Sequence, residues 1–199
     1  MKLPRKNKVV IIGLGNIGLK YDLNSQQNII QSHSKAFVKH PNFDLVAGID
    51  TSKKNCDIFC EKYNIKTYLN IEKGLTRENP DVIIISSPTF THKEISNKIC
   101  NLHLSPKIVL CEKPIAYSLE ESQEIVNLFS KRKIPLFVNY MRRSDPGAIE
   151  IKHRIENNNL KSPAKGFCWY SKGILNNASH FVNLFQYWLG EIKSSKNIN

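Results

Sequence analysis

Short runs of apolar residues recur along this chain and are too short to be helices. The runs that we interpret as strands are residues 9–12, 45–50, 81–86, 108–111 and 135–140. Such runs are typical of parallel strands that are buried on both faces of a sheet. Between them, helical spacing places Cys56, Phe59, Cys60 and Tyr63 on one face that we expect to be buried. The alternation of strand and helix predicts an α/β fold with a doubly wound parallel sheet.

Capping residues mark the starts of three predicted helices. Ser52 is expected to cap the helix that contains Cys56 and Phe59. Thr91 with Glu94, and likewise Ser118 with Glu121, have the spacing of a capping box. Each of these helices follows the carboxyl end of a predicted strand, the edge at which parallel sheets bind ligands.

The first predicted strand runs directly into the sequence G-L-G-N-I-G at residues 13–18. In dinucleotide-binding units the first glycine allows a tight turn, the second lets a pyrophosphate approach the backbone, and the third lets helix and strand pack closely. The helix that we expect to follow would offer free N–H groups to the phosphates. A purely structural turn is the alternative. The residues assigned to cofactor binding here are Gly13, Gly15, Asn16, Ile17 and Gly18.

The second predicted strand ends in an acid, Asp50, 32 residues beyond Gly18. An acid at this strand end normally accepts hydrogen bonds from the ribose of NAD, usually about 20 residues after the last glycine. Residues 21–28 are polar and turn-like, and helical periodicity resumes only at residues 34–39. We therefore expect an insertion that accounts for the excess, either a surface loop or a lid or substrate-contacting loop at the cofactor cleft.

Asp50 favours NAD as the cofactor. Lys53 and Lys54 follow closely enough to accommodate a 2′-phosphate, so NADP stays the alternative cofactor. Thr51 is a further candidate contact, although a helix cap is a competing role for both Asp50 and Thr51.

Two later strand ends contribute further candidates. The third predicted strand leads into residues 86–92, where we assign Ser87, Pro88, Thr89 and His92 to the cofactor side of the cleft. A lone histidine at such a place can equally be structural. The fourth predicted strand is followed by Glu112 and Lys113, and a lysine in an apolar neighbourhood can have its pKa lowered by desolvation and act as an acid or a base.

Composition sets the broad class. With 199 residues, 41% of them hydrophobic and 23% charged, the chain has room for one globular domain and part of another. The net charge of +12 is spread along the chain, so we expect neither nucleic acid nor a membrane as a partner. The five cysteines have no ligand-like spacing, which predicts no metal site and favours a reduced cytoplasm.

Several of these features, in this order, resemble the glucose–fructose oxidoreductase and inositol dehydrogenase family (Gfo/Idh/MocA). The matching elements are residues 13–18, Pro88 with His92, Glu112-Lys113-Pro114, residues 139–143 and His180. The resemblance implies a cytoplasmic NAD(P)-dependent oxidoreductase that acts on a sugar, nucleotide sugar or cyclitol, for example in surface-polysaccharide metabolism. It implies that Lys113 contacts substrate and cofactor near the nicotinamide, and that Pro88 and His92 line the nicotinamide pocket.

The resemblance also divides the chain into a Rossmann domain at residues 1–141 and an incomplete α+β substrate domain at residues 142–199. In the second part we expect a helix at residues 149–155, a strand at residues 166–170, and a helix that ends at Gly190. The family commonly has Asp four residues before the histidine that matches His180, and often another three after it. This chain has Asn176 and Asn183 there.

An asparagine can hydrogen-bond a sugar hydroxyl but cannot take up its proton. Acid–base work is therefore expected of His180, Lys113 or both, with Asn176 as a third catalytic candidate. Family members continue with a large antiparallel sheet that completes the substrate site and usually the homo-oligomer interface, so we expect this chain to be truncated. The alternatives are an inactive NAD(P)-binding remnant and a regulatory protein that senses NAD(H).

Overall fold

The computed structural model describes residues 5–25, 28–159 and 165–196. The chain forms two compact units, Met1–Asn139 and Tyr140–Asn199, which we call unit 1 and unit 2 and describe separately. None of the helices in the described part is long and apolar enough to cross a membrane.

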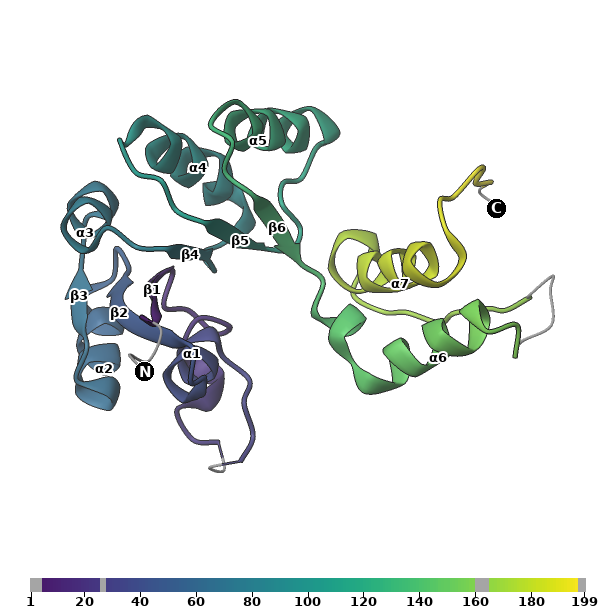
Figure 1. Ribbon diagram of the computed structural model, residues 1–199, viewed down its shortest axis with the longest axis horizontal. Coiled ribbons are helices and arrows are strands. Elements are labelled where there is room, and N and C mark those ends of the chain that lie inside the picture. Colours follow the sequence, from purple (N-terminus) through teal and green to yellow (C-terminus); the bar gives the residue numbers. More distant parts are fainter. Residues whose placement is uncertain (1–4, 26–27, 160–164, 197–199) are drawn as a thin grey trace. The chain divides into compact units, whose positions relative to one another are not determined.

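Unit 1 is built on a six-stranded sheet with the order β3-β2-β1-β4-β5-β6, in which all neighbouring strands are parallel (Figure 1). This is the strand order of a Rossmann fold, and it confirms the predicted fold class. The strands are β1 (Asn7–Ile12), β2 (Phe43–Ile49), β3 (Lys66–Tyr68), β4 (Val82–Ile85), β5 (Ile108–Glu112) and β6 (Leu136–Asn139).

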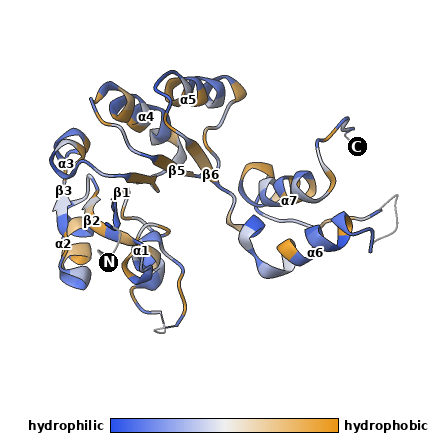
Figure 2. Cartoon of the chain, viewed as in Figure 1, coloured by the Kyte–Doolittle hydropathy of each residue, from blue (hydrophilic) through white to orange (hydrophobic). Residues whose placement is uncertain are grey.

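The central strands β1 and β4 are buried on both faces, as the continuous apolar runs predict, whereas the edge strands β3 and β6 are partly exposed. Val10 and Ile12 of β1 belong to one core cluster, whereas Val9 and Ile11 belong to another on the opposite face. The first cluster includes side chains of α3 (Ile71–Glu78), α4 (His92–Asn101) and α5 (Leu119–Lys131). The second is covered by α1 (His33–Lys39) and α2 (Lys53–Tyr63). Figure 2 shows the hydrophobic colour along β4 and β5 and mixed colours on the helices.

Two of the three predicted helix caps are confirmed. The Ser52 hydroxyl accepts a hydrogen bond from the amide of Asn55, and the Ser118 hydroxyl accepts one from the amide of Glu121. The capping box at Thr91 is wrong, because the Thr91 hydroxyl is used elsewhere and bonds the Ser87 hydroxyl at 2.7 Å.

The burial expected for Cys60 is also wrong. Cys56 and Phe59 are 3% and 0% exposed, but Cys60 is exposed. The buried face of α2 follows the spacing Cys56, Phe59, Tyr63, and Cys60 lies one position beyond it around the helix axis.

No α-helix starts directly at the glycine loop. The residues after Gly18 make a turn and a short 3₁₀ helix, η1 (Lys20–Asp22), and α1 begins only at His33. The expected insertion is therefore present, and it separates the glycine loop from its helix.

Unit 2 consists of helical segments in its described part. They are the 3₁₀ helix η3 (Met141–Ser144), α6 (Pro146–Glu156), the π-helical turn η4 (Ile174–Ala178) and α7 (Ser179–Leu189). The helix expected at residues 149–155 is thus confirmed within α6, and α7 stops at Gly190, whose φ is +92°. The strand expected at residues 166–170 is wrong, since these residues have no regular secondary structure. A strand needs neighbours to satisfy its edges.

Candidate functional site

A cleft of about 340 Å³ lies at the carboxyl ends of β1, β2 and β4 in unit 1. Six of the predicted cofactor residues line it, namely Gly13, Gly15, Asp50, Thr51, Ser87 and Pro88. Among the other candidates, Asn16, Ile17, Gly18, Thr89, His92, Glu112 and Lys113 are not part of this lining.

Geometry gives each glycine of the loop a different task. Gly13 has a φ of +97°, and a side chain there would place its Cβ 2.5 Å from the amide nitrogen of Ser87. At Gly18 a Cβ would clash with the carbonyl oxygen of Gly13. A Cβ at Gly15, by contrast, would meet nothing within 4 Å. Gly13 and Gly18 therefore keep the loop tight, while Gly15 faces the open space of the cleft.

The turn after Gly15 also offers hydrogen-bond donors. In the described part of the chain, no acceptor pairs with the amide groups of Asn16 and Ile17. Asn16 is exposed and Ile17 is half-buried. Backbone N–H groups at such a turn are suited to bind the oxygens of a phosphate.

Asp50 holds the glycine loop as well as facing the cleft. Its Oδ2 accepts hydrogen bonds from the amide of Leu14 at 2.7 Å and from the Asn55 side chain at 3.2 Å. Its Oδ1 accepts one from the amide of Ser52 at 2.7 Å. Ser52, and neither Asp50 nor Thr51, is the side-chain cap of α2. The carboxylate is thus fixed in orientation at the cleft, and Oδ1, which accepts one of these hydrogen bonds, keeps a lone pair for a further donor.

Several lining residues escaped the sequence interpretation. Leu69, Ile71 and Ile95 give the cleft an apolar wall. Lys98 of α4 also lines it and is paired with Glu94 at 2.8 Å and Glu72 at 3.6 Å. The hydrogen bond to Glu94 raises the pKa of Lys98. No local motif marks these residues, because the loop after β3 and the helix α4 are far apart in the sequence and come together only in the folded chain.

His92 lies behind the cleft and is fully buried. Its two ring nitrogens lie 3.0 Å from backbone carbonyl oxygens, Nδ1 from that of Ile115 and Nε2 from that of Ser87. The thiol of Cys111 is 3.4 Å from Nδ1, and burial raises the pKa of this thiol to about 12, so it keeps its proton. His92 therefore ties the loop after β4 to the loop after β5.

Glu112 is held by two other elements of unit 1. Its Oε1 lies 2.8 Å from Nε2 of His33, at the start of α1, and accepts a hydrogen bond from the Asn139 side chain at 2.6 Å. Burial acts to raise the pKa of Glu112, but the hydrogen bonds from His33 and Asn139 outweigh it and lower this pKa. Lys113, the next residue, is half-buried and is joined to Pro114 by a cis peptide bond.

The other catalytic candidates belong to unit 2. His180 is 8% exposed at the start of α7, and its ring packs edge-on against that of Tyr140 with centroids 5.9 Å apart. Asn176 is exposed in η4. The Asn183 side chain accepts a hydrogen bond from Nε of Arg143 at 2.5 Å. The assignment of Lys113, His180 and Asn176 as one catalytic set stays a prediction.

Among the residues that the structure describes, no three His, Cys, Asp or Glu side chains are grouped as metal ligands would be.

Comparison with known proteins matches residues 7–140 to the family described as an oxidoreductase family with an NAD-binding Rossmann fold (Gfo/Idh/MocA). The chain is 28% identical over 153 residues to the glucose-6-phosphate 3-dehydrogenase of Bacillus subtilis, covering 77% of this chain and 39% of that protein. It is 24% identical over 157 residues to the myo-inositol 2-dehydrogenase of Thermotoga maritima, with 78% and 42% covered. The chain thus spans about two fifths of these curated relatives.

Solved structures show the same fold. An oxidoreductase from Agrobacterium radiobacter in complex with NAD⁺ and L-tartaric acid superposes with a TM-score of 0.77 at 18% identity, covering 98% of this chain and 59% of that one. The WlbA dehydrogenase of Bordetella pertussis, in complex with NADH and UDP-GlcNAcA, gives a TM-score of 0.72 at 19% identity, with 94% and 56% covered.

Proposed function

Because this chain belongs to the Gfo/Idh/MocA family of oxidoreductases with an NAD-binding Rossmann fold, we propose that it serves NAD-dependent hydride transfer at a hydroxyl-bearing carbon of a sugar, nucleotide sugar or cyclitol. The observation that supports this most directly is the open space at Gly15, in a cleft that also presents the Asp50 carboxylate. The named activities of the Bacillus and Thermotoga relatives support the substrate class.

The residues present fit the cofactor. The open side of Gly15 and the amides of Asn16 and Ile17 would receive the diphosphate, which is drawn to backbone N–H groups at such a turn. Asp50 would accept hydrogen bonds from the adenosine ribose. The apolar wall of Leu69, Ile71 and Ile95 would flank the adenine.

We propose NAD over NADP for an electrostatic reason. A 2′-phosphate would stand beside the Asp50 carboxylate, and like charges at short range repel. Lys53, which could compensate, is already paired with Asp57 at 3.2 Å.

The proposed chemistry is the removal of a hydride from a carbinol carbon while its hydroxyl loses a proton. When bound, NAD supplies the hydride acceptor. Lys113 and His180 would hold the hydroxyl and take up its proton, the role of a general base. Asn176 would orient a substrate hydroxyl by hydrogen bonding, since an amide cannot accept the proton.

The test is a titration of the purified chain with NADH and NADPH, followed by nicotinamide fluorescence. We expect saturable binding, with NADH at least tenfold tighter than NADPH. Gly15→Asp should abolish it, because the new carboxylate would occupy the space for the diphosphate and repel it. Gly166→Asp is the matched control, since Gly166 also has nothing within 4 Å but lies in unit 2. Folded protein that binds neither nucleotide would refute the proposal.

An inactive NAD-binding protein is the second candidate, and the amide at Asn176 favours it. A screen of polyols, sugar phosphates and nucleotide sugars with NAD⁺ separates the two. Reduction of NAD⁺ with any of them supports the enzyme, whereas tight NADH binding with no turnover across the screen favours the inactive protein.

A further inference from the structure

Two hydrogen bonds join the turn before the insertion to the helix α1 that follows it. The amides of His33 and Ser34 donate to the carbonyls of Ile17 and Gly18, at 2.9 and 3.1 Å. In an uninterrupted α-helix these carbonyls would bond the amides four residues later, at positions 21 and 22. His33 therefore stands where residue 21 would stand, and the difference, 33 − 21, makes an insertion of 12 residues.

The length of the insertion explains the unusual spacing of the acid. Asp50 follows Gly18 by 32 residues, and without the 12 inserted residues the spacing is 20. This is the spacing typical of dinucleotide-binding units. An insertion that starts at residue 21 and ends at residue 32 thus separates the glycine-loop turn from α1.

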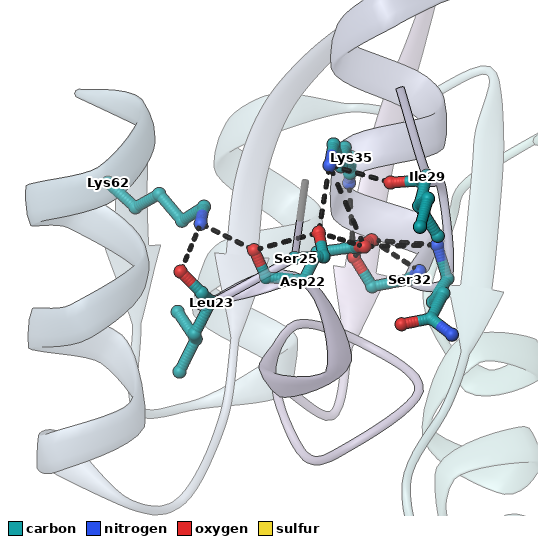
Figure 3. A network of polar contacts seen from close by, with 8 residues as sticks. Asp22, Leu23, Ser25, Ile29, Ser32, Lys35 and Lys62 are labelled. Carbon is teal, nitrogen blue, oxygen red and sulfur yellow. Dashed lines mark hydrogen bonds and ion pairs between the residues drawn. The ribbon is translucent and has the colours of Figure 1, made fainter. Parts of the chain in front are cut away.

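A buried carboxylate closes this loop. Asp22 is 1% exposed, and its Oδ2 accepts hydrogen bonds from the amides of Gln31 at 2.9 Å and Ser32 at 2.6 Å, and from the Ser32 hydroxyl at 2.6 Å. Its Oδ1 accepts one from the Ser25 hydroxyl at 2.8 Å, and Lys35 pairs with it at 3.8 Å. Figure 3 shows these partners converging on Asp22 from both ends of the insertion.

Two lysines attach the loop to the neighbouring helices (Figure 3). Nζ of Lys62, in α2, donates to the carbonyls of Asp22 and Leu23 at 2.7 and 3.3 Å. Nζ of Lys35, in α1, donates to the carbonyl of Ile29 at 2.6 Å. The loop is therefore held by side chains of both neighbouring helices, α1 and α2, although its sequence is polar.

His33 follows Ser32 directly, so the contact that closes the loop also sets the position of His33. Its ring then lies 2.8 Å from Glu112, the residue before Lys113. The side chains of His33 and Glu112 are only 11% and 13% exposed, so their contact is largely shielded from water.

We propose that Asp22 is a positioning residue: by closing the inserted loop it delivers His33 to Glu112 and thereby fixes the turn that holds Lys113. The proposal rests on the proposed function, because the role of Lys113 is part of it. The loop itself adds nothing to cofactor binding, and Asp22 is needed only because the loop is present.

The experiment compares the full chain with two separate variants of it. Asp22→Asn keeps the size of the side chain but loses the negative charge and one acceptor oxygen. Deletion of residues 21–32 joins Lys20 to His33, which restores the four-residue spacing from Ile17. The histidine ring signals are followed by ¹⁵N NMR without cofactor, and the His33 signals are assigned with His33→Gln. Glu112→Gln gives the reference for a His33–Glu112 contact that has lost its negative charge.

We expect the His33 signals of Asp22→Asn to move toward those of Glu112→Gln, and its affinity for NADH to fall about threefold to tenfold. The deletion variant should keep the wild-type His33 signals, and its affinity for NADH should stay within twofold of the wild-type affinity. If Asp22→Asn does not fold, Ser25→Ala removes one hydrogen bond to Asp22 and should shift the same signals by less.

Two results would overturn the proposal. One is an unchanged His33 spectrum in folded Asp22→Asn, which would make Asp22 merely structural. The other is a deletion variant that folds but loses the His33–Glu112 signature, which would show that the loop is itself required. Since the spectra need no nucleotide, a wild-type chain that fails to bind NADH would refute the proposed function and leave this test readable.

Discussion

Unit 1 and unit 2 differ most in how much of their apolar surface they bury. In unit 1 both faces of the sheet are covered, and large side chains such as Phe59, Ile85 and Phe129 are at most 1% exposed. In the described part of unit 2 the buried apolar side chains are Ala148, Ala178 and Leu184. Among the exposed apolar residues of unit 2 are Phe167, Trp169, Ile174, Val182 and Leu189.

This difference in burial predicts a difference in how strongly each unit is stabilised. Burial of apolar area is the main favourable term in folding, so unit 1 has within itself what a stable domain needs. The helices of unit 2 have amphipathic sequences but bury little against one another. We infer that unit 1 is stable on its own, whereas the residues around His180 in unit 2 depend more on their surroundings.

The largest effect is expected from the core of unit 1. Phe59→Ala should lower the free energy of unfolding by about 3–5 kcal/mol, because it removes a fully buried ring and leaves a cavity. Phe185→Ala, at a ring that is 38% exposed in unit 2, should cost about 1 kcal/mol or less. Urea unfolding followed by far-UV circular dichroism measures both.

The two tryptophans sharpen this test. Both, Trp169 and Trp188, lie in unit 2, so their fluorescence reports unit 2 alone. If the units are independently stable, Phe59→Ala shifts the dichroism transition and leaves the tryptophan transition in place. Equal losses of unfolding free energy for Phe59→Ala and Phe185→Ala would contradict the difference in apolar burial between unit 1 and unit 2.

An intermediate effect on the free energy of unfolding is expected when the pH is lowered, and it arises from Asp22 in unit 1. Burial acts to raise its pKa, but the hydrogen bonds from Ser32, Gln31 and Ser25 outweigh it and lower the pKa from 3.8 to about 2. The carboxylate therefore stabilises the folded state above pH 4, and this contribution is lost as the pH falls through 2. A lowering of this size corresponds to about 2 kcal/mol.

The check compares wild type with Asp22→Asn in urea between pH 7 and pH 2. The difference in unfolding free energy should be constant above about pH 4 and shrink below it. A difference that stays the same at pH 2 would show that the Asp22 carboxylate is not held in the folded state as described.

The smallest effect is expected at the exposed aromatic residues of unit 2. Trp169 is 86% exposed, so Trp169→Ser should change the unfolding free energy by less than about 0.5 kcal/mol. The dichroism transition in urea measures it, since the variant loses one fluorescent ring. A loss above 1 kcal/mol would mean that Trp169 is buried in solution by contacts that the chain makes there.

The sheet could be predicted from the sequence because its information is local. The run at residues 9–12 is apolar at every position, which is typical of a strand buried on both faces, whereas β3 (Lys66–Tyr68) has no such run and was not predicted. The glycine loop was equally readable from its motif. The constraint at Gly18 arises within the loop, whereas a side chain at Gly13 would also clash with the distant backbone of Ser87. The expectation of a strand at residues 166–170 failed because pairing depends on partners far along the chain.

The candidate site was predictable only in part. Gly15, Asp50 and Ser87 stand at strand ends, where a local pattern marks them. Lys98 and Ile95 reach the cleft from α4, and no spacing rule connects them with the glycine loop. Asp22 was missed for another reason: an acid within a polar segment looks solvated, and only the folded loop shows that its oxygens are buried and bonded to Ser32 and Gln31.

Because of the insertion at residues 21–32, positions that are far apart in the sequence lie close together in the structure. The amides of His33 and Ser34 bond the carbonyls of Ile17 and Gly18, so the insertion starts and ends beside the same turn. We expect its length to be variable without a change at the glycine loop, as long as its two ends are held together by Asp22. The middle of the insertion, away from these bonded ends, is therefore a suitable place to graft a foreign peptide, such as an epitope or a fluorophore-binding tag.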